Sequence, residues 1–339
     1  MNKTPRIALG ALSLTLLLAA CGSGEQDESD GFTVVSTTTI LGDVAGDIAT
    51  CGGANAVTLM PVGADPHEFA PSSEQVATLV GADLVVANGL GLEEGLQQAL
   101  ESAETDGAPV MHVAELVDPL PFGEDEHAHG DEDEHAHGEE EDHADEGAAD
   151  LADEHAHGGE DPHFWLDMDR VARAAELIGE QLAQTTGDQV FIDCGNEVAA
   201  EIRAAETEVI GTLDSIPEGK RVLVTDHDAF GYFADRYGFE VAGTVIPGGS
   251  TLGSPSSAEL ADLVATMRAE GVTTIFANTA EPETLADAVA AELADGSTPV
   301  DVQVIPLYVG SLGETGSEAD TYIGMMSTNA QLIAKGLNR

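Results

Sequence analysis

The stretch that decides the fold is Leu84-Val85-Val86-Ala87-Asn88-Gly89, four apolar residues followed by a polar residue and a glycine. An apolar run without alternation is typical of a strand that is buried on both faces. We predict further short strands, separated by predicted helices, at 33–36, 57–60, 109–112, 221–225, 241–246, 273–277 and 302–306. This alternation indicates parallel sheets that are covered by helices on both faces.

Two predicted helices, 168–183 and 190–213, follow each other without a strand between them. The second is about 36 Å long at 1.5 Å per residue, which is enough to connect two lobes. We therefore expect an α/β protein with two lobes, each a mostly parallel sheet flanked by helices, joined by one long rigid helix. The expected boundaries are 32–188 for the N-terminal lobe, 189–215 for the linking helix and 216–339 for the C-terminal lobe. Further predicted helices cover 40–50, a segment that starts at Ser72 or Ser73, 92–103, 228–237, 256–270, 282–293 and 317–337.

The first 31 residues are not expected to belong to the fold. Lys3 and Arg6 precede an apolar run, 8–20, which is too short to span a bilayer comfortably and is typical of a cleaved export signal. Leu18-Ala19-Ala20-Cys21 resembles a bacterial lipobox, so residues 1–21 are predicted to be a lipoprotein signal and Cys21 to carry the lipid. The alternative is an ordinary signal followed by a chance cysteine. Residues 22–31 are too hydrophilic to pack and are expected to form a flexible tether.

Acidic residues outnumber basic residues by 63 to 11, which gives a formal net charge of −52. Such a surface repels nucleic acids and anionic lipid headgroups. We therefore exclude nucleic-acid binding and expect membrane attachment only through the N-terminal lipid. The segment 123–161 has 18 of the acidic residues, so the rest of the chain is still strongly acidic.

Besides Cys21 the chain has two cysteines, Cys51 and Cys194. An even pair in an exported protein is more often bridged than free, and neither cysteine has the Cys-x-x-Cys spacing of a metal site. We expect these two cysteines to form a disulfide.

Three histidines follow apolar runs near proline or aromatic residues. His67 lies in Gly-Ala-Asp-Pro-His-Glu-Phe-Ala-Pro, His163 in Asp-Pro-His-Phe-Trp-Leu-Asp, and His227 in Thr-Asp-His-Asp-Ala-Phe. Open α/β sheets bind ligands at the carboxyl ends of strands, and neutral imidazole is a preferred ligand of Zn²⁺. Singly, these histidines could be surface residues or a helix cap; together they predict a zinc site. The carboxylates that could accept the second ring N–H are those of Asp161, Asp167, Asp226 and Asp228.

The segment 123–160, inside the range of the N-terminal lobe, has a composition unlike either lobe. The pentad Glu-His-Ala-His-Gly occurs at 126–130, 134–138 and 154–158, and bulky apolar residues are almost absent. Such a composition cannot offset the entropy of ordering, so we expect a disordered loop. Repeated identical histidine units favour weak zinc binding over a merely solvated charge run, and weak sites would raise the zinc concentration near the main site. The predicted low-affinity ligands are His127, His129, His135, His137, His143, His155 and His157.

Five segments carry a resemblance to a known family. They are Gly-Ala-Asp-Pro-His-Glu-Phe-Ala-Pro-Ser (63–72), Asn-Gly-Leu-Gly-Leu-Glu (88–93), Asp-Pro-His-Phe-Trp-Leu-Asp (161–167), His-Asp-Ala-Phe-Gly-Tyr-Phe-Ala-Asp-Arg-Tyr-Gly (227–238) and Asp-Thr-Tyr-Ile-Gly-Met-Met-Ser-Thr-Asn-Ala (320–330). In this order they resemble metal-binding lipoproteins of the ZnuA/TroA type, the cluster A-I (cluster 9) solute-binding components of zinc and manganese ABC importers. The resemblance implies two α/β lobes joined by a rigid helix, with the metal between them.

The resemblance also implies a set of metal ligands. His67 and His163 would be ligands from the N-terminal lobe and His227 a ligand from the C-terminal lobe. Relatives with a carboxylate in place of His227 tend toward manganese, so the histidine favours zinc over manganese. Many relatives supply a fourth ligand from an aspartate shortly before the Asp-Thr-Tyr segment, but this chain has Gly310 there. The open candidates for the fourth position are Glu68, Glu314, a water molecule and a histidine of the 123–160 loop.

A catalytic zinc site also has three histidines and an open position. This chain has no His-Glu-x-x-His helix, and two lobes hinged on a helix suit capture and release better than catalysis, so we expect no enzyme activity. The resemblance implies an exported, monomeric receptor, anchored by lipid at the outer face of the cytoplasmic membrane, that delivers Zn²⁺ to the permease and ATPase of an ABC importer. The alternatives are a surface-anchored zinc buffer or adhesin and a manganese-binding homologue.

Overall fold

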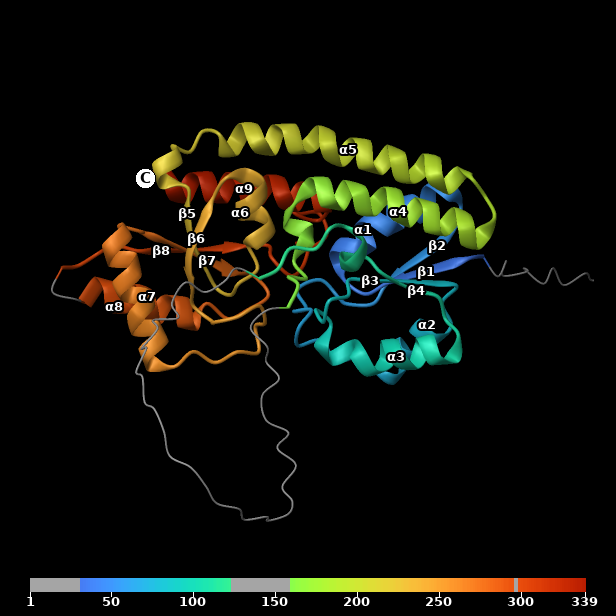
Figure 1. Cartoon of the computed structure of the whole chain (residues 1–339), viewed down its shortest axis with the longest axis horizontal. Coiled ribbons are helices and arrows are strands. Elements are labelled where there is room, and N and C mark those ends of the chain that lie inside the picture. Colours follow the sequence, from blue (N-terminus) through green and yellow to red (C-terminus); the bar gives the residue numbers. More distant parts are fainter. Residues whose placement is uncertain (1–30, 123–158, 296–297) are drawn as a thin grey trace, which may run out of the picture. The chain divides into compact units, whose positions relative to one another are not determined.

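Two four-stranded parallel sheets form the framework of the chain (Figure 1). The computed structural model describes residues 31–122, 159–295 and 298–339. The strand order is β2-β1-β3-β4 in the first sheet and β6-β5-β7-β8 in the second, so both sheets have the same topology. The strands are β1 (Thr33–Ser36), β2 (Asn55–Thr58), β3 (Leu84–Ala87), β4 (Val110–His112), β5 (Val222–Thr225), β6 (Glu240–Thr244), β7 (Thr274–Asn278) and β8 (Gln303–Leu307). The prediction of an α/β protein with two parallel-sheet lobes is confirmed.

Helices cover the sheets, and two of them, α2 and α7, begin with a capping box. Ser72 accepts a hydrogen bond from the backbone N–H of Gln75, whose side chain accepts one from the backbone N–H of Ser72. The same capping box joins Ser256 and Glu259 at a second helix. The α-helices are α1 (Thr39–Gly52), α2 (Ser73–Val80), α3 (Gln97–Asp106), α4 (Met168–Thr186), α5 (Val190–Leu213), α6 (Gly231–Tyr237), α7 (Ser257–Glu270), α8 (Thr284–Asp295) and α9 (Tyr322–Leu337). Within the described residues, no helix combines the length and the apolar character needed to cross a bilayer.

Helix α5 connects the two lobes. It packs against α1 and α4 on the side of the first sheet and against α9 on the side of the second, and Figure 1 shows it running along both lobes. The close approach of α4 and α5 requires glycine at two positions. A Cβ atom on Gly179 would lie 2.5 Å from the carbonyl oxygen of Phe191, and one on Gly195 would lie 2.6 Å from that of Ala175. The predicted linking helix is therefore held tightly along its first half.

A disulfide between Cys51 and Cys194 reinforces this arrangement. The two Cα atoms are 5.9 Å apart. Cys51 lies in α1 and Cys194 in α5, so the expected bond is present and fixes the linking helix to the N-terminal lobe.

One hydrophobic cluster extends through both lobes. It contains Val34 of β1, Leu223 of β5 and Leu307 of β8, together with buried side chains of α1, α4, α5 and α9. The opposite faces of the sheets have separate clusters, to which Val35 and Val224 belong. Adjacent strand residues thus point into different cores, which explains why the strands are apolar without alternation.

Several elements differ in their bounds from the predictions. Helix α6 begins at Gly231 rather than 228, and α9 begins at Tyr322 rather than 317. At α9 the reason is a cap: the Thr321 side chain accepts a hydrogen bond from the backbone N–H of Gly324, so the helix starts after Thr321. Strand β2 lies two residues earlier than predicted, and the predicted helix 92–103 is divided into a short 3₁₀ helix, Glu94–Leu96, and α3.

The predicted loop 123–160 lies almost entirely outside the described residues. At its end, Glu160 forms an isolated antiparallel bridge with Pro121, so the loop is closed at its base. The histidines predicted as weak ligands in this segment, the predicted signal 1–21 with Cys21, and the tether up to residue 30 also lie outside the described part.

Candidate metal centre

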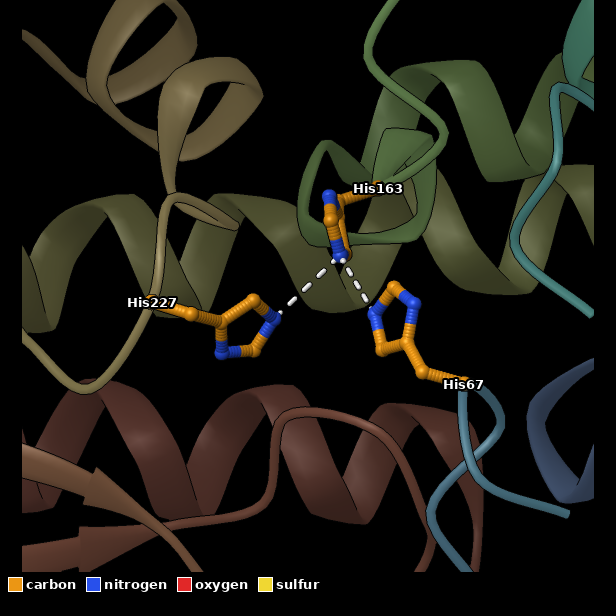
Figure 2. A group of neighbouring side chains, drawn as sticks. All are labelled: His67, His163 and His227. Carbon is orange, nitrogen blue, oxygen red and sulfur yellow. Dashed lines mark hydrogen bonds between the residues drawn. The ribbon is translucent and has the colours of Figure 1, made fainter. Parts of the chain in front are cut away.

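Three segments bring the predicted histidines together. His67 follows β2, His227 follows β5 directly, and His163 precedes the short 3₁₀ helix Phe164–Leu166. All three are buried, with exposed fractions of 4% for His67, 1% for His163 and 2% for His227. Their rings point toward one another (Figure 2). The structure therefore joins two histidines of the N-terminal lobe to one of the C-terminal lobe.

The repeated Asp-Pro-His motif folds in the same way at both N-terminal positions. The Asp65 carboxylate accepts a hydrogen bond of 2.8 Å from the backbone N–H of His67. Asp161 does the same for the backbone N–H of His163 at 2.9 Å. Such Asx turns arise locally from the aspartate side chain and the backbone two residues later. The motif thus gives the backbone at both histidines the same local turn.

The ring nitrogens have the spacing of metal ligands. The Nε2 atom of His163 lies 3.3 Å from that of His67 and 3.3 Å from that of His227 (Figure 2). Zn–N bonds of about 2.0–2.1 Å at tetrahedral angles place neighbouring nitrogens about 3.3 Å apart. One ligand atom from each histidine lies within 4.8 Å of the other two. The three histidines can therefore hold one ion with three nitrogen ligands.

Carboxylates fix two of the rings through their other nitrogen. Asp161 is 2.7 Å from Nδ1 of His163, and Asp226 is 2.9 Å from Nδ1 of His227. An ionised carboxylate only accepts hydrogen bonds, so Nδ1–H donates and the lone pair of Nε2 faces the centre. Of the other predicted partners, Asp167 caps α4 instead, where its side chain accepts from the backbone N–H of Asp169.

Burial and mutual repulsion keep two imidazoles neutral. Burial, together with the nearby His163 and His227, lowers the pKa of His67 to about 3. Burial and His227 also hold the pKa of His163 well below its usual value. Burial opposes protonation of His227 as well, but the charge and hydrogen bond of Asp226 outweigh it and raise the pKa of this group. Burial raises the pKa of Asp161 to about 7.

A segment of the C-terminal lobe closes one wall of the site. The indole N–H of Trp165 donates to the carbonyl oxygen of Val309 at 2.8 Å, and the backbone N–H of Leu312 donates to Thr39 Oγ1 at 3.0 Å. Gly310, the position at which the resemblance implies an aspartate, lines the site. A Cβ atom there would lie only 2.8 Å from Cδ of Pro66. A longer side chain at 310 therefore requires the wall to move away from the His67 loop.

The predicted carboxylate candidates for a fourth ligand do not join the histidines. Glu68 and Glu314 are both exposed, and neither belongs to the group of converging ligand atoms in the described residues. The fourth-ligand assignment stays open among Glu68, Glu314, a water molecule and a histidine of the 123–160 loop.

The structure adds acidic residues that the sequence did not single out. Glu94 places a carboxylate oxygen 3.7 Å from Nδ1 of His67 and accepts a hydrogen bond from the Ser250 hydroxyl in the other lobe. Burial and the nearby carboxylates of Asp65 and Glu68 raise the pKa of Glu281 to about 8. These contacts join residues far apart in the chain, so no local sequence signal could have predicted them.

The sequence model of the family "Zinc-uptake complex component A periplasmic" matches residues 34–336. The chain belongs to this family. The match extends over both sheets, the linking helix and all three histidines.

Named relatives are similar along almost their whole length. The manganese-binding lipoprotein MntA of Halalkalibacterium halodurans is 27% identical over 332 residues, with 96% of each chain covered. The zinc-binding protein TroA of Treponema pallidum is 28% identical, with 98% of this chain and 97% of that protein covered. A solved structure of periplasmic TroA superposes with a TM-score of 0.74 at 26% identity, covering 91% of this chain and 100% of the other.

Family membership defines the class of the protein. Members are solute-binding components of metal transport rather than enzymes, and this chain is accordingly an exported, lipid-anchored metal-binding receptor. Because similar relatives are named for zinc and for manganese, similarity alone leaves the metal undetermined.

Proposed function

We propose that this protein captures Zn²⁺ with His67, His163 and His227 and delivers it to the permease and ATPase of an ABC importer. The observation that supports this best is the pair of Nε2–Nε2 separations of 3.3 Å, one within the N-terminal lobe and one between the lobes. They suit a single ion with tetrahedral Zn–N geometry.

The donor set favours zinc over manganese. Mn²⁺ prefers carboxylate, carbonyl and water oxygens, whereas imidazole suits Zn²⁺. The converging ligands are three nitrogens, and Gly310 offers no carboxylate. The relatives named for manganese make Mn²⁺ the alternative cargo. Affinities for the two ions therefore decide between these proposals.

Capture and release follow from the position of His227. Two ligands stand on the lobe that the disulfide ties to α5, and the third stands on the other lobe. Separation of the lobes would remove His227 from the ion and break the wall contacts, such as the Trp165–Val309 hydrogen bond. An ion held by two imidazoles is bound far more weakly, so docking on a permease that opens the lobes would release zinc.

Two further parts of the proposal rest on sequence. Cys21 would carry the lipid that anchors the receptor. The seven loop histidines, from His127 to His157, would bind zinc weakly and raise its concentration beside the main site. Deletion of 123–158 should slow zinc acquisition at scarce zinc and leave the affinity of the main site nearly unchanged.

The test is a competition titration with zinc and manganese against chelators, using the loop-deleted protein. We expect one tight zinc equivalent, weaker manganese binding and strong thermal stabilisation by zinc through mass action on the folded state. His227→Ala should remove most of this stabilisation. Tighter binding of manganese than zinc would overturn the zinc assignment, and unchanged zinc stabilisation in the His227→Ala variant would exclude His227 as a ligand.

A further inference from the structure

A second cavity lies in the C-terminal lobe, next to the metal centre. Its volume is about 210 Å³, and its wall includes Asp226, Thr251, Asn278 and Glu281. None of the three histidines lines it, although Asn278 borders both this cavity and the metal centre. Asp226 stands between the two spaces, because its Oδ2 atom accepts the hydrogen bond from His227.

Two buried oxygen atoms in this wall have no partner. They are Oδ1 of Asp226 and Oγ1 of Thr251, neither of which makes a hydrogen bond within the described residues. Their residues are only 6% and 5% exposed. A buried polar atom without a partner loses its hydrogen bonds to water on folding, so such atoms usually have a bound ligand or water. The cavity is large enough to hold such a ligand or water.

The charge around the cavity is negative and uncompensated. Glu281 lines it together with Asp226, and Asp65 and Glu68 of the other lobe add repulsion at Glu281. No lysine or arginine is among the described residues that line the cavity. This environment is consistent with the raised pKa of Glu281, and a cation would remove the repulsion.

We propose that this cavity binds a hard divalent cation of the Ca²⁺ or Mg²⁺ type through Asp226 Oδ1, Thr251 Oγ1 and the Glu281 carboxylate, with water completing its shell. The donors are all oxygens, which suit such ions better than zinc. A water molecule occupies about 30 Å³ of liquid volume, so the cavity has room for the ion and several waters. The inference is independent of the cargo proposed for the histidines.

The shared carboxylate couples the two sites. A cation on Oδ1 of Asp226 withdraws charge from the group that orients and polarises His227, and it also repels an ion at the histidines. Each ion should therefore lower the affinity of the other by the same factor, because coupling free energies are reciprocal. We expect each ion to lower the affinity of the other about tenfold. Mutation of a group that hydrogen-bonds a metal ligand typically lowers metal affinity by a factor of about this size.

The experiment is a calorimetric titration of the zinc-free full chain with CaCl₂, for the native protein and for Thr251→Val, Glu281→Gln and Glu292→Gln. Glu292 is an exposed acidic residue of α8 and serves as the matched control. We expect one saturable calcium site, weakened about tenfold or more by Thr251→Val and Glu281→Gln and unchanged by Glu292→Gln. Thr251→Val removes one hydroxyl at constant shape, so it keeps the test valid if Glu281→Gln disturbs the fold.

Weak, non-saturating calcium binding that is the same in all four proteins would overturn the proposal, because the acidic surface alone would then account for the calcium binding. A repeat of the titration with zinc-loaded protein should show calcium affinity reduced about tenfold. If the protein failed to bind zinc, the proposed cargo would be wrong. The calcium titration of the zinc-free protein would still test the cavity site by itself.

Discussion

The two lobes have the same strand order but contribute unequally to the proposed metal site. Strand β1 occupies the place in its sheet that β5 occupies in the other. The segment after β5 begins with Asp226-His227, whereas the segment after β1 is Thr37-Thr38-Thr39. These hydroxyls make structural hydrogen bonds instead: Thr37 donates to Glu93, and Thr39 accepts from the backbone N–H of Leu312. The shared topology therefore determines which positions after a strand can present a metal-binding side chain. The residue at each position determines whether that lobe contributes a metal ligand.

The unequal numbers of histidines suggest different roles for the two lobes. The N-terminal lobe has two of the three histidines and a disulfide to the linking helix. The C-terminal lobe has one histidine, the wall around Gly310 and the second cavity. We therefore regard the N-terminal lobe as the platform and the C-terminal lobe as the part that completes the site.

Removal of the central ligand should have the largest effect. His163 has its Nε2 atom 3.3 Å from those of both other histidines, so it takes part in both of the shortest ligand contacts at the site. We expect His163→Ala to weaken zinc binding by about 10³-fold, or about 4 kcal/mol. The measurement is chelator competition. The matched control is His112→Ala, which removes a partly exposed histidine paired with Glu104; an equal loss in both variants would contradict the assignment.

Loss of the disulfide should destabilise the platform without altering the site. Cys51 and Cys194 are separated by 143 residues, so their bond restricts the unfolded chain strongly. We expect the double change to serine to lower the free energy of unfolding by about 3 kcal/mol. Denaturant unfolding in the presence of a chelator measures this, and zinc titration of the same protein should give an affinity within a few-fold of the native value. A large loss of zinc affinity would show that the disulfide also maintains the geometry of the zinc ligands.

The pH dependence of zinc affinity should distinguish the histidines of the two lobes. The pKa values of His67 and His163 are lowered, so these groups stay neutral in mildly acidic solution, whereas that of His227 is raised. Below the pKa of His227, zinc must displace one proton, and affinity should fall about tenfold per pH unit. Titrations between about pH 6.5 and 5 test this. A fall of a hundredfold or more per unit would show that a second group, either Asp161 or an N-terminal imidazole, also becomes protonated in the metal-free protein.

Substitution of Gly310 should have the smallest effect. Its added Cβ would press on Pro66, so the wall must shift slightly. Overpacking of this kind costs about 1 kcal/mol, and we expect Gly310→Ala to weaken zinc binding about fivefold. Gly219→Ala, where a Cβ meets nothing within 4 Å, is the control in the same assay. Unchanged affinity would mean that the wall adapts freely and does not limit closure.

Local sequence signals predicted most of the framework and the central part of the site. The bounds of β3 and α5 agree with the prediction, because an apolar run ended by Asn88-Gly89 and a long periodic helix are strong local signals. The starts of α6 and α9 were placed too early, since residues 228–230 and 317–321 make turns and caps that periodicity does not reveal. The Asp-Pro-His motifs identified His67 and His163 because their Asx turns are local.

The sequence by itself determined the parallel α/β lobes, the linking helix and the three histidines, since each depends on residues that are close together in the chain. Only the tertiary structure decided that Glu94 approaches His67 and that Thr251 and Glu281 line one cavity beside the site. The reason is physical: these relations depend on how the two sheets are packed against a shared core, and contacts between distant segments leave no periodic or local trace in the sequence.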